Sequence, residues 1–241
     1  EDTPREIGRL VETLHETLEQ HRVLLERNRA FIAEATHQIK TPIAAIVTTS
    51  EVLERTLPDT YQGQARQVVV RARYASKLVA QLLTRASLTY REMLKVSEEV
   101  NLAQLAESVA RTMDPTAEVR EIGLSVELVD APVMVRGDRV AIREALVCLV
   151  DNAIAHTPEL SDVAIRVGRS DDRAWIEVVD NGPGFQAAPD LAIDAFVSGD
   201  AKGSHQGLGL AIVKRVADSH GAELQLENRP EGGARCRLLF A

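Results

Sequence analysis

Four features of this chain could take part in chemistry: a histidine, an aspartate at a strand end, a glycine run and a helical asparagine. The histidine, His37, lies in the helical stretch "FIAEATHQIKTPIAAI", and a neutral imidazole nitrogen is a competent nucleophile near pH 7. It precedes Ile39 by two residues, about 200° around the helix from that apolar residue, so it is expected on the solvent face. Pro42 is expected to bend the helix just after His37. In the alternative interpretation, His37 is simply an exposed helical residue beside a tolerated proline.

The aspartate, Asp180, ends an alternating strand in the segment "DNGPGF", with Gly182 and Gly184 following it. Counting by two places Asp180 on the buried face of that strand. An unpaired carboxylate at the edge of a core is costly and requires a donor, a role that the exocyclic amine of adenine would fill. A turn that ends a hairpin is the alternative interpretation.

The glycine run consists of Gly203, Gly207 and Gly209 in "GSHQGLGLAIV", just before a predicted helix. Glycines permit close backbone approach, and a helix N-terminus offers unpaired N–H groups to phosphate. Many such runs are only tight turns. The chain contains neither a Walker A lysine motif nor a strand-GxGxxG-helix arrangement.

The asparagine, Asn152, lies on a predicted helix, one face of which contains Glu144, Cys148, Asn152 and His156. A neutral amide oxygen on that face can coordinate Mg²⁺, the hard cation that accompanies ATP. A solvated helical asparagine is the alternative.

Together these segments resemble the sensor histidine kinases of bacterial two-component systems, over residues from about 28 to 240. The H-box of that family is matched in register by His37, Lys40, Thr41, Pro42 and Ile43. The other three segments are similar, in order and approximate spacing, to the N, G1 and G2 boxes of the GHKL ATP-binding fold.

The resemblance implies a role for each matching residue. His37 is the phosphorylated imidazole, and Thr41 helps to orient a water for dephosphorylating a partner regulator. Asn152 holds Mg²⁺, and residues 186–206 form an ATP lid. The remaining nucleotide contacts are expected from Asp180, Gly182, Gly184, Lys202, Gly207, Leu208 and Gly209.

Three positions depart from the family pattern. Gln38 replaces the acidic residue that usually follows the histidine, and an amide cannot take a proton as a general base. Cys148 replaces a second asparagine, and Ala155 replaces a basic residue that reaches the phosphates. We therefore expect slow autophosphorylation, with Lys202 compensating for part of the lost charge.

A helical hairpin is expected to present His37. Residues 5 to about 92 form a helix, a break at Leu57-Pro58-Asp59, a reversal helped by Gly63, and a second helix. The return helix is expected to bury Ala65, Val68, Ala72, Ala75, Val79, Leu82 and Ala86. Because two helices cannot hide their apolar seams alone, a homodimeric four-helix bundle is expected.

Mixed α and β structure is expected from about residue 97. Asn101 and Asp138 are predicted to cap two helices. A strand is predicted in "LSVELVD", and a hairpin turning at Ser170 to Asp172 is predicted in 162–180. A helix from about Leu208 to Ser219 precedes strands near 222–228 and 234–240. The predicted fold is α plus α/β, a dimeric helical-hairpin bundle followed by an α/β sandwich of the GHKL (Bergerat) ATPase type.

Composition restricts the class of protein. The net charge of −8 argues against nucleic-acid binding. Two cysteines do not make a disulfide framework, which fits a reducing cytosol. The longest apolar stretch, Ala145 to Val150, is far shorter than the roughly 20 residues of a membrane span. We expect a cytoplasmic domain of a bacterial inner-membrane protein, with its membrane anchor outside this sequence.

These observations predict a signal-transmitting helix in 1–28, a dimerisation and histidine phosphotransfer domain in 29–93 and a catalytic ATP-binding domain in 97–241. The expected function is ATP-dependent autophosphorylation on His37 and transfer to an aspartate of a response regulator receiver domain, with regulator phosphatase activity. A kinase-weak nucleotide-binding scaffold, or a phosphatase-dominant sensor that docks a regulator, is the alternative. Another GHKL ATPase, of the gyrase or MutL type, is disfavoured by the hairpin that bears His37.

Overall fold

The computed structural model describes residues 12, 15, 17, 34, 38, 39, 41–130, 132–185 and 207–241. The chain divides into two compact units, Glu1–Met93 and Leu94–Ala241. His37, Lys202, the expected lid and most of the expected signal-transmitting helix lie outside the described residues. None of the described helices combines the length and the apolar character that crossing a bilayer requires.

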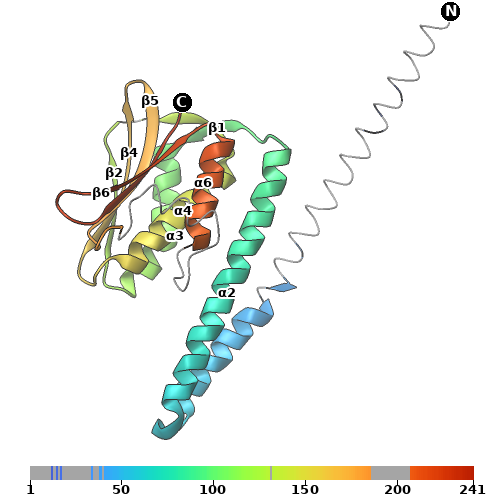
Figure 1. The fold of residues 1–241 in the computed structure, drawn as a ribbon, viewed down its shortest axis with the longest axis vertical. Helices are drawn as coiled ribbons and strands as arrows, with labels where there is room; N and C mark the ends of the chain where they lie inside the picture. Colours follow the sequence, from blue (N-terminus) through green and yellow to red (C-terminus); the bar gives the residue numbers. More distant parts are fainter. Residues whose placement is uncertain are drawn as a thin grey trace, which may run out of the picture. The chain divides into compact units, whose positions relative to one another are not determined.

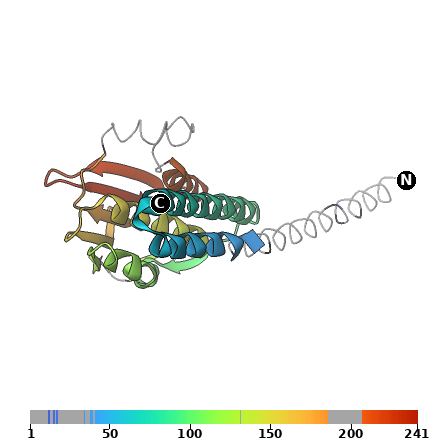
Figure 2. The ribbon, with the colours of Figure 1, turned by 90° about the horizontal axis from the view of Figure 1, so that it is seen from below.

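The first unit contains a helical hairpin. A helix over residues 41–56 lies beside α2 (Asp59–Met93) in both views (Figure 1, Figure 2). The reversal takes place at Leu57 and Pro58, because a proline ring prevents the preceding helix from continuing. The predicted break is therefore confirmed. The predicted contribution of Gly63 is wrong, since Gly63 lies inside α2, where a side chain would meet nothing within 4 Å.

Two ion pairs link the helices of the hairpin. Arg66 Nε lies 3.1 Å from Glu54 Oε1, and Arg73 Nη2 lies 2.7 Å from Glu51 Oε1. Both pairs are largely exposed, so each contributes little to stability but favours one register of the two helices. Within the single chain, Ala65 is buried, whereas Val68 and Leu82 of the predicted seam remain exposed.

The second unit is an α/β sandwich. Its five-stranded sheet has the order β2-β4-β5-β7-β6, in which only the β2–β4 pair is parallel. The strands are β2 (Gly123–Leu128), β4 (Asp162–Ser170), β5 (Arg173–Asp180), β6 (Glu223–Asn228) and β7 (Ala234–Leu239). A separate antiparallel pair, β1 (Glu98–Asn101) and β3 (Met134–Gly137), was not predicted.

Three helices cover one face of this sheet (Figure 1, Figure 2): α3 (Leu102–Glu118), α4 (Arg139–His156) and α6 (Gly207–Ser219). Their apolar sides meet the inner sheet residues in one core. The largest fully buried side chains include Leu102, Leu105, Ile142, Leu146, Leu149, Ile165, Ile176 and Leu238. The predicted α/β sandwich is confirmed.

Both predicted helix caps are present. The Asn101 side chain accepts from Gln104 N at 3.1 Å, and Asp138 Oδ1 accepts from Val140 N at 2.9 Å. A further contact joins the start of α4 to the end of α6, because His220 Nε2 accepts from Asp138 N at 2.8 Å. The cap and this contact together hold the start of α4 in place.

Strand β5 is buried on both faces, although its alternation predicted one buried face. On the face away from the helices, Trp175 packs over Gly168, where an added Cβ would lie 2.5 Å from the indole ring. The Arg237 guanidinium covers the same ring at 4.5 Å from its centroid and also donates to Glu177 Oε2 at 2.8 Å. A long-range stack therefore buries a face that the local pattern assigns to solvent.

Candidate functional site

The end of β5 places the Asp180 carboxylate at the edge of the core, where it is 8% exposed. Oδ1 accepts from Gly182 N at 2.8 Å and from Ala234 N at 3.1 Å. Among the described residues, no hydrogen bond reaches Oδ2. One carboxylate oxygen is thus held by the backbone, and the other can accept from a bound donor.

The loop after Asp180 has room only for glycine at two positions. A Cβ on Gly182 would lie 3.0 Å from both Asp180 Oδ1 and the His156 carbonyl oxygen. Gly184 has a φ of +74°, and a Cβ there would lie 2.6 Å from Asn228 Oδ1. The predicted glycines therefore serve close backbone approach, and Gly182 joins this loop to the end of α4.

The predicted face of α4, called here the α4 stripe, contains Glu144, Cys148, Asn152 and His156. It lies near α6 and near the loop after Asp180. Cys148 and Asn152 are half-buried, and a Cβ on Gly209 would lie 4.0 Å from Cys148 Cβ. Asn152 lies one turn after Cys148 and one turn before His156. Asn152 thus lies on α4 between Cys148, which is next to α6, and His156, whose carbonyl oxygen is next to the Asp180 loop.

Gly207, Leu208 and Gly209 form the first turn of α6. The N–H groups of a first helical turn have no partner within the helix, and the helix dipole adds partial positive charge there. Because α6 packs against α4 and Gly209 lies next to Cys148, this turn and Asn152 share one region of the sandwich. The arrangement suits an anionic group.

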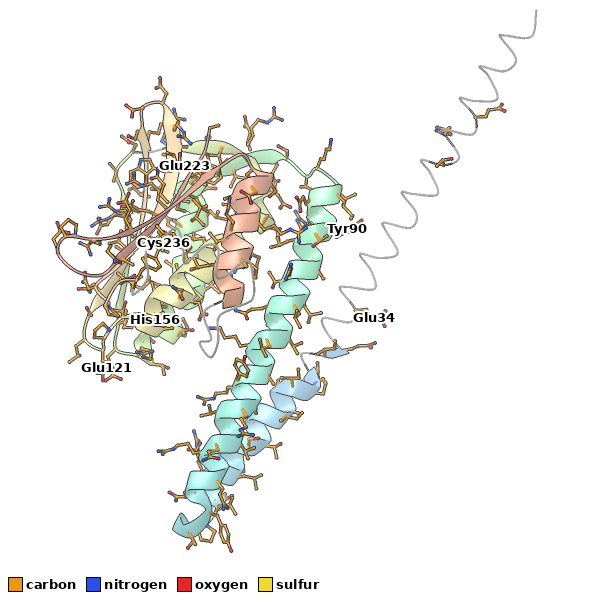
Figure 3. The ribbon with its side chains drawn as sticks, in the orientation of Figure 1. Glu34, Tyr90, Glu121, His156, Glu223 and Cys236 are labelled. Atoms are coloured by element: carbon orange, nitrogen blue, oxygen red, sulfur yellow. The ribbon has the colours of Figure 1, made fainter. Side chains whose placement is uncertain are left out.

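Cys236 lies on the inner face of β7, and Figure 3 shows it between the ends of the sandwich marked by Glu223 and His156. The pKa of the Cys236 thiol is raised to about 12, mainly by burial and to a smaller extent by the negative charge of Asp180. The thiol therefore stays neutral at physiological pH. It provides an uncharged surface close to the Asp180 carboxylate.

On the hairpin, the structure describes Gln38 and Thr41 but not His37. Gln38 Nε2 donates to Glu34 Oε1 at 2.9 Å, one helical turn earlier. Both Gln38 and Thr41 are exposed and helical. The Gln38 amide is thus engaged with the Glu34 carboxylate.

Several residues at the site were not found from the sequence. Thr157, the C-cap of α4, is 1% exposed, and its hydroxyl has no hydrogen-bond partner in the part of the chain that the structure describes. Asn228, Arg229 and Gly233 lie at the β6–β7 turn and contact the Asp180 loop. Pro230 and the adjacent glycines 232 and 233 were the sequence signals of a turn here.

The polar groups of the site fit a nucleotide whose base carries an exocyclic amine. A half-satisfied carboxylate suits an exocyclic amine, and the α6 N-terminus suits phosphate oxygens. Within the described residues, no group of three or more His, Cys, Asp or Glu side chains could hold a metal ion.

Two families match this chain. Residues 27–91 match the His Kinase A (phospho-acceptor) domain. Residues 137–241 match the histidine kinase-, DNA gyrase B- and HSP90-like ATPase family.

Similar proteins extend the match to nearly the whole chain. The sensor protein kinase PmrB of Pseudomonas aeruginosa is 34% identical over 236 residues, which are 96% of this chain and 49% of the relative. The sensor protein QseC of Escherichia coli (strain K12) is 26% identical over 242 residues, which are 98% of this chain and 52% of the relative. The chain spans about half the length of the curated relatives it matches.

Solved structures agree with these relatives. Full-length ShkA in complex with AMPPNP has a TM-score of 0.60 and 25% identity, covering 87% of this chain and 45% of that protein. The cytoplasmic segment of the histidine kinase QseC has a TM-score of 0.50 and 25% identity, covering 69% of this chain and 92% of that segment.

Proposed function

This chain belongs to the family of bacterial sensor histidine kinases, and from that premise we propose that it transfers the γ-phosphoryl group of ATP to its own His37. The phosphoryl group then passes to an aspartate of a response regulator receiver domain. The observation that carries the proposal is the Asp180 carboxylate, held by two backbone N–H groups through one oxygen while the other can accept.

In this proposal the Asp180 carboxylate accepts a hydrogen bond from the exocyclic amine of adenine. Gly182 and Gly184 let the base approach the backbone. The first turn of α6, with Gly207, Leu208 and Gly209, receives the phosphates through its N–H groups. Lys202 is assigned to the phosphates from the resemblance alone. The AMPPNP bound by ShkA supports an adenine nucleotide as the ligand.

Asn152 is proposed to hold Mg²⁺ through its amide oxygen. The ion would neutralise charge on the transferring phosphoryl group, the main requirement of such reactions. Support comes from the place of Asn152 on the α4 stripe, between Cys148 beside α6 and His156 beside the Asp180 loop.

At the acceptor, an imidazole nitrogen of His37 forms a bond to the γ-phosphorus while the bond to the β–γ bridging oxygen breaks and ADP leaves. Gln38 cannot accept the imidazole proton, and its amide donates to Glu34. Another group or solvent has to take that proton, so autophosphorylation is proposed to be slow. Thr41 is proposed to orient a water when the regulator is dephosphorylated.

A homodimer through the hairpin is proposed because the apolar seam remains uncovered in one chain. Ile46 is 55% exposed, Leu53 46% and Val68 51%. A cleft of about 350 Å³ lies at the same seam, lined by Ser50, Leu53, Leu57, Tyr61, Gln64, Ala65 and Val68. The matching helices of a second copy would bury this surface.

We assign residues 1–28 to a signal-transmitting helix, 29–93 to dimerisation and phosphotransfer, and 97–241 to ATP binding. The regulator is proposed to dock near Ile43, Ala44 and Val47. The likeness to the cytoplasmic segment of QseC supports a cytoplasmic location for this chain within a membrane-anchored sensor.

A second candidate function is a kinase-weak scaffold or phosphatase-dominant sensor that binds nucleotide and docks a regulator. The hydrogen bond between Gln38 and Glu34 favours this second function, because the side chain that follows His37 is already engaged. Cys148 and Ala155 also remove groups that would help to hold Mg²⁺-ATP.

The experiment is incubation with γ-labelled ATP. We expect acid-labile, base-stable label on the wild type and on His15→Ala, a control on an exposed helical histidine, but none on His37→Ala. Added receiver domain should take the label from the kinase. Nucleotide binding without label would support the scaffold, and label that survives in His37→Ala would contradict the proposed acceptor.

A further inference from the structure

The turn between β6 and β7 lies against the loop that follows Asp180. Its two flanking strands pair antiparallel, with Asn228 opposite Ala234. The turn is closed by Arg229 N, which donates to the Gly233 carbonyl oxygen at 3.0 Å. Neighbouring side chains from this turn reach the start and the end of the Asp180 loop, although they are more than 40 residues away in sequence.

Asn228 holds the end of the loop. Its Oδ1 accepts from Phe185 N at 2.6 Å, and its Nδ2 donates to the Phe185 carbonyl oxygen at 3.0 Å. The amide thus contacts both polar groups of one backbone residue, as a neighbouring strand would. The same side chain leaves no space for a side chain at Gly184, because a Cβ there would lie 2.6 Å from Asn228 Oδ1.

Arg229 holds the start of the loop. Its Nη1 donates to the Asp180 carbonyl oxygen at 3.0 Å and to Asn181 Oδ1 at 2.9 Å. The Arg229 side chain is 18% exposed, so these bonds are only partly screened by water. Its charge lies beside the residue whose carboxylate is proposed to bind adenine.

The two residues therefore restrain Asp180 and Phe185 at opposite ends of a short loop containing Gly182 and Gly184. Glycines leave such a loop with many accessible conformations, and ordering them on binding would weaken affinity. Restraint before binding removes that cost. Neither residue hydrogen-bonds to Asp180 Oδ2, the oxygen proposed to meet the base, so their effect passes through the loop.

We propose that Asn228 and Arg229 are positioning residues that set the affinity for adenine nucleotide by holding the Asp180–Phe185 loop in its binding conformation. This inference rests on the proposed function of Asp180. It assigns to the β6–β7 turn a role in nucleotide affinity and not in the transfer step.

The experiment measures ATP affinity, and the autophosphorylation rate at saturating ATP, for Asn228→Ala and Arg229→Ala. Each variant should bind ATP roughly tenfold more weakly, the cost of one or two hydrogen bonds. The rate at saturating ATP should stay within about twofold of wild type, because the reacting groups are untouched. Arg229→Lys should recover part of the affinity, since one ammonium nitrogen can donate to the two acceptors that Nη1 contacts.

Gln225→Ala is the matched control. Gln225 lies on β6, as Asn228 does, and its side chain donates to Glu223 Oε1 at 2.8 Å and not to the Asp180 loop, so its loss should leave ATP affinity unchanged. ATP affinity equal to wild type in both Asn228→Ala and Arg229→Ala would overturn the inference. A fall in maximal rate and thermal stability without a change in ATP affinity would also overturn the inference. Absence of ATP binding by the wild type would instead overturn the proposed function itself.

Discussion

Gly233 and Asp180 approach each other so closely that a Cβ on Gly233 would lie 1.9 Å from the Asp180 carbonyl oxygen. Gly233 also has a φ of +86°, a conformation that L side chains rarely adopt. The next residue, Ala234, donates its N–H to the Asp180 carboxylate. The β6–β7 turn therefore determines where that carboxylate is held.

Gly233→Ala should destabilise the second unit by at least about 2 kcal/mol, because overpacking is added to backbone strain. It should also weaken ATP binding, since the turn must move away from Asp180. Gly232→Ala is the matched control: Gly232 also has a positive φ, +98°, but a side chain there would meet nothing within 4 Å. Urea unfolding measures both variants, and equal losses of stability would contradict the importance of the contact.

Asp180→Asn should weaken ATP binding by about ten- to a hundredfold, the usual cost of roughly 1.5–3 kcal/mol for a charge-assisted hydrogen bond. Glu177→Gln tests a buried carboxylate on the other face of the same strand, where Glu177 pairs with Arg237. That control should lower stability and leave affinity unchanged. Titration with a fluorescent ATP analogue measures both, and an unaffected Asp180→Asn would remove the adenine assignment.

Gln38→Glu should raise the autophosphorylation rate, by an amount up to the ~10²–10⁴-fold typical of general-base catalysis. A carboxylate at 38 can take a proton, and like charge would disfavour its present contact with Glu34. Gln67→Glu, an exposed change of equal charge on α2, should have no effect. The initial rate of label incorporation is the measurement, and an unchanged or lower rate would show that the missing base does not limit the reaction.

Local signals in the sequence were sufficient for the parts of the fold that neighbouring residues determine. Asn101 and Asp138 cap their helices, Pro58 ends the first hairpin helix, and Asp180 lies on the buried side of β5. Each depends on residues within a few positions along the chain, where capping, proline geometry and alternation act.

Long-range contacts account for what could not be predicted. Trp175 is buried outside the main core because Gly168 and Arg237 come to it from adjacent strands. Asn228 and Arg229 gain their importance only when β6 and β7 bring them to the Asp180 loop. No local period encodes such pairings, because they depend on strand order and on backbone positions distant in sequence.

Alkaline pH should lower the stability of the second unit through Cys236. Its pKa is 9.0 in the reference state and about 12 when folded, so above pH 9 the unfolded chain loses a proton that the folded chain keeps. Stability associated with this group is complete below pH 9 and is lost as pH rises towards 12. The loss between pH 8 and pH 10 should be on the order of 1 kcal/mol.

Urea unfolding at pH 8, 9 and 10 tests this expectation, with Cys236→Ala as the comparison. The variant should start less stable, because it leaves a small cavity, but should lack the additional alkaline loss. The same pH dependence in wild type and Cys236→Ala would show that the thiol is not the group responsible.

The most direct test of the account is to follow backbone amide signals by NMR while the chain is titrated with a non-hydrolysable ATP analogue. We predict saturable shifts at Gly182, Gly184 and Ala234, which surround the Asp180 carboxylate, and unchanged signals at Val100 and Val135 in the β1–β3 sheet. Asp180→Asn should need a higher concentration for the same shifts. A titration that leaves the Asp180 loop unchanged at millimolar nucleotide would contradict the central claim that this loop binds adenine.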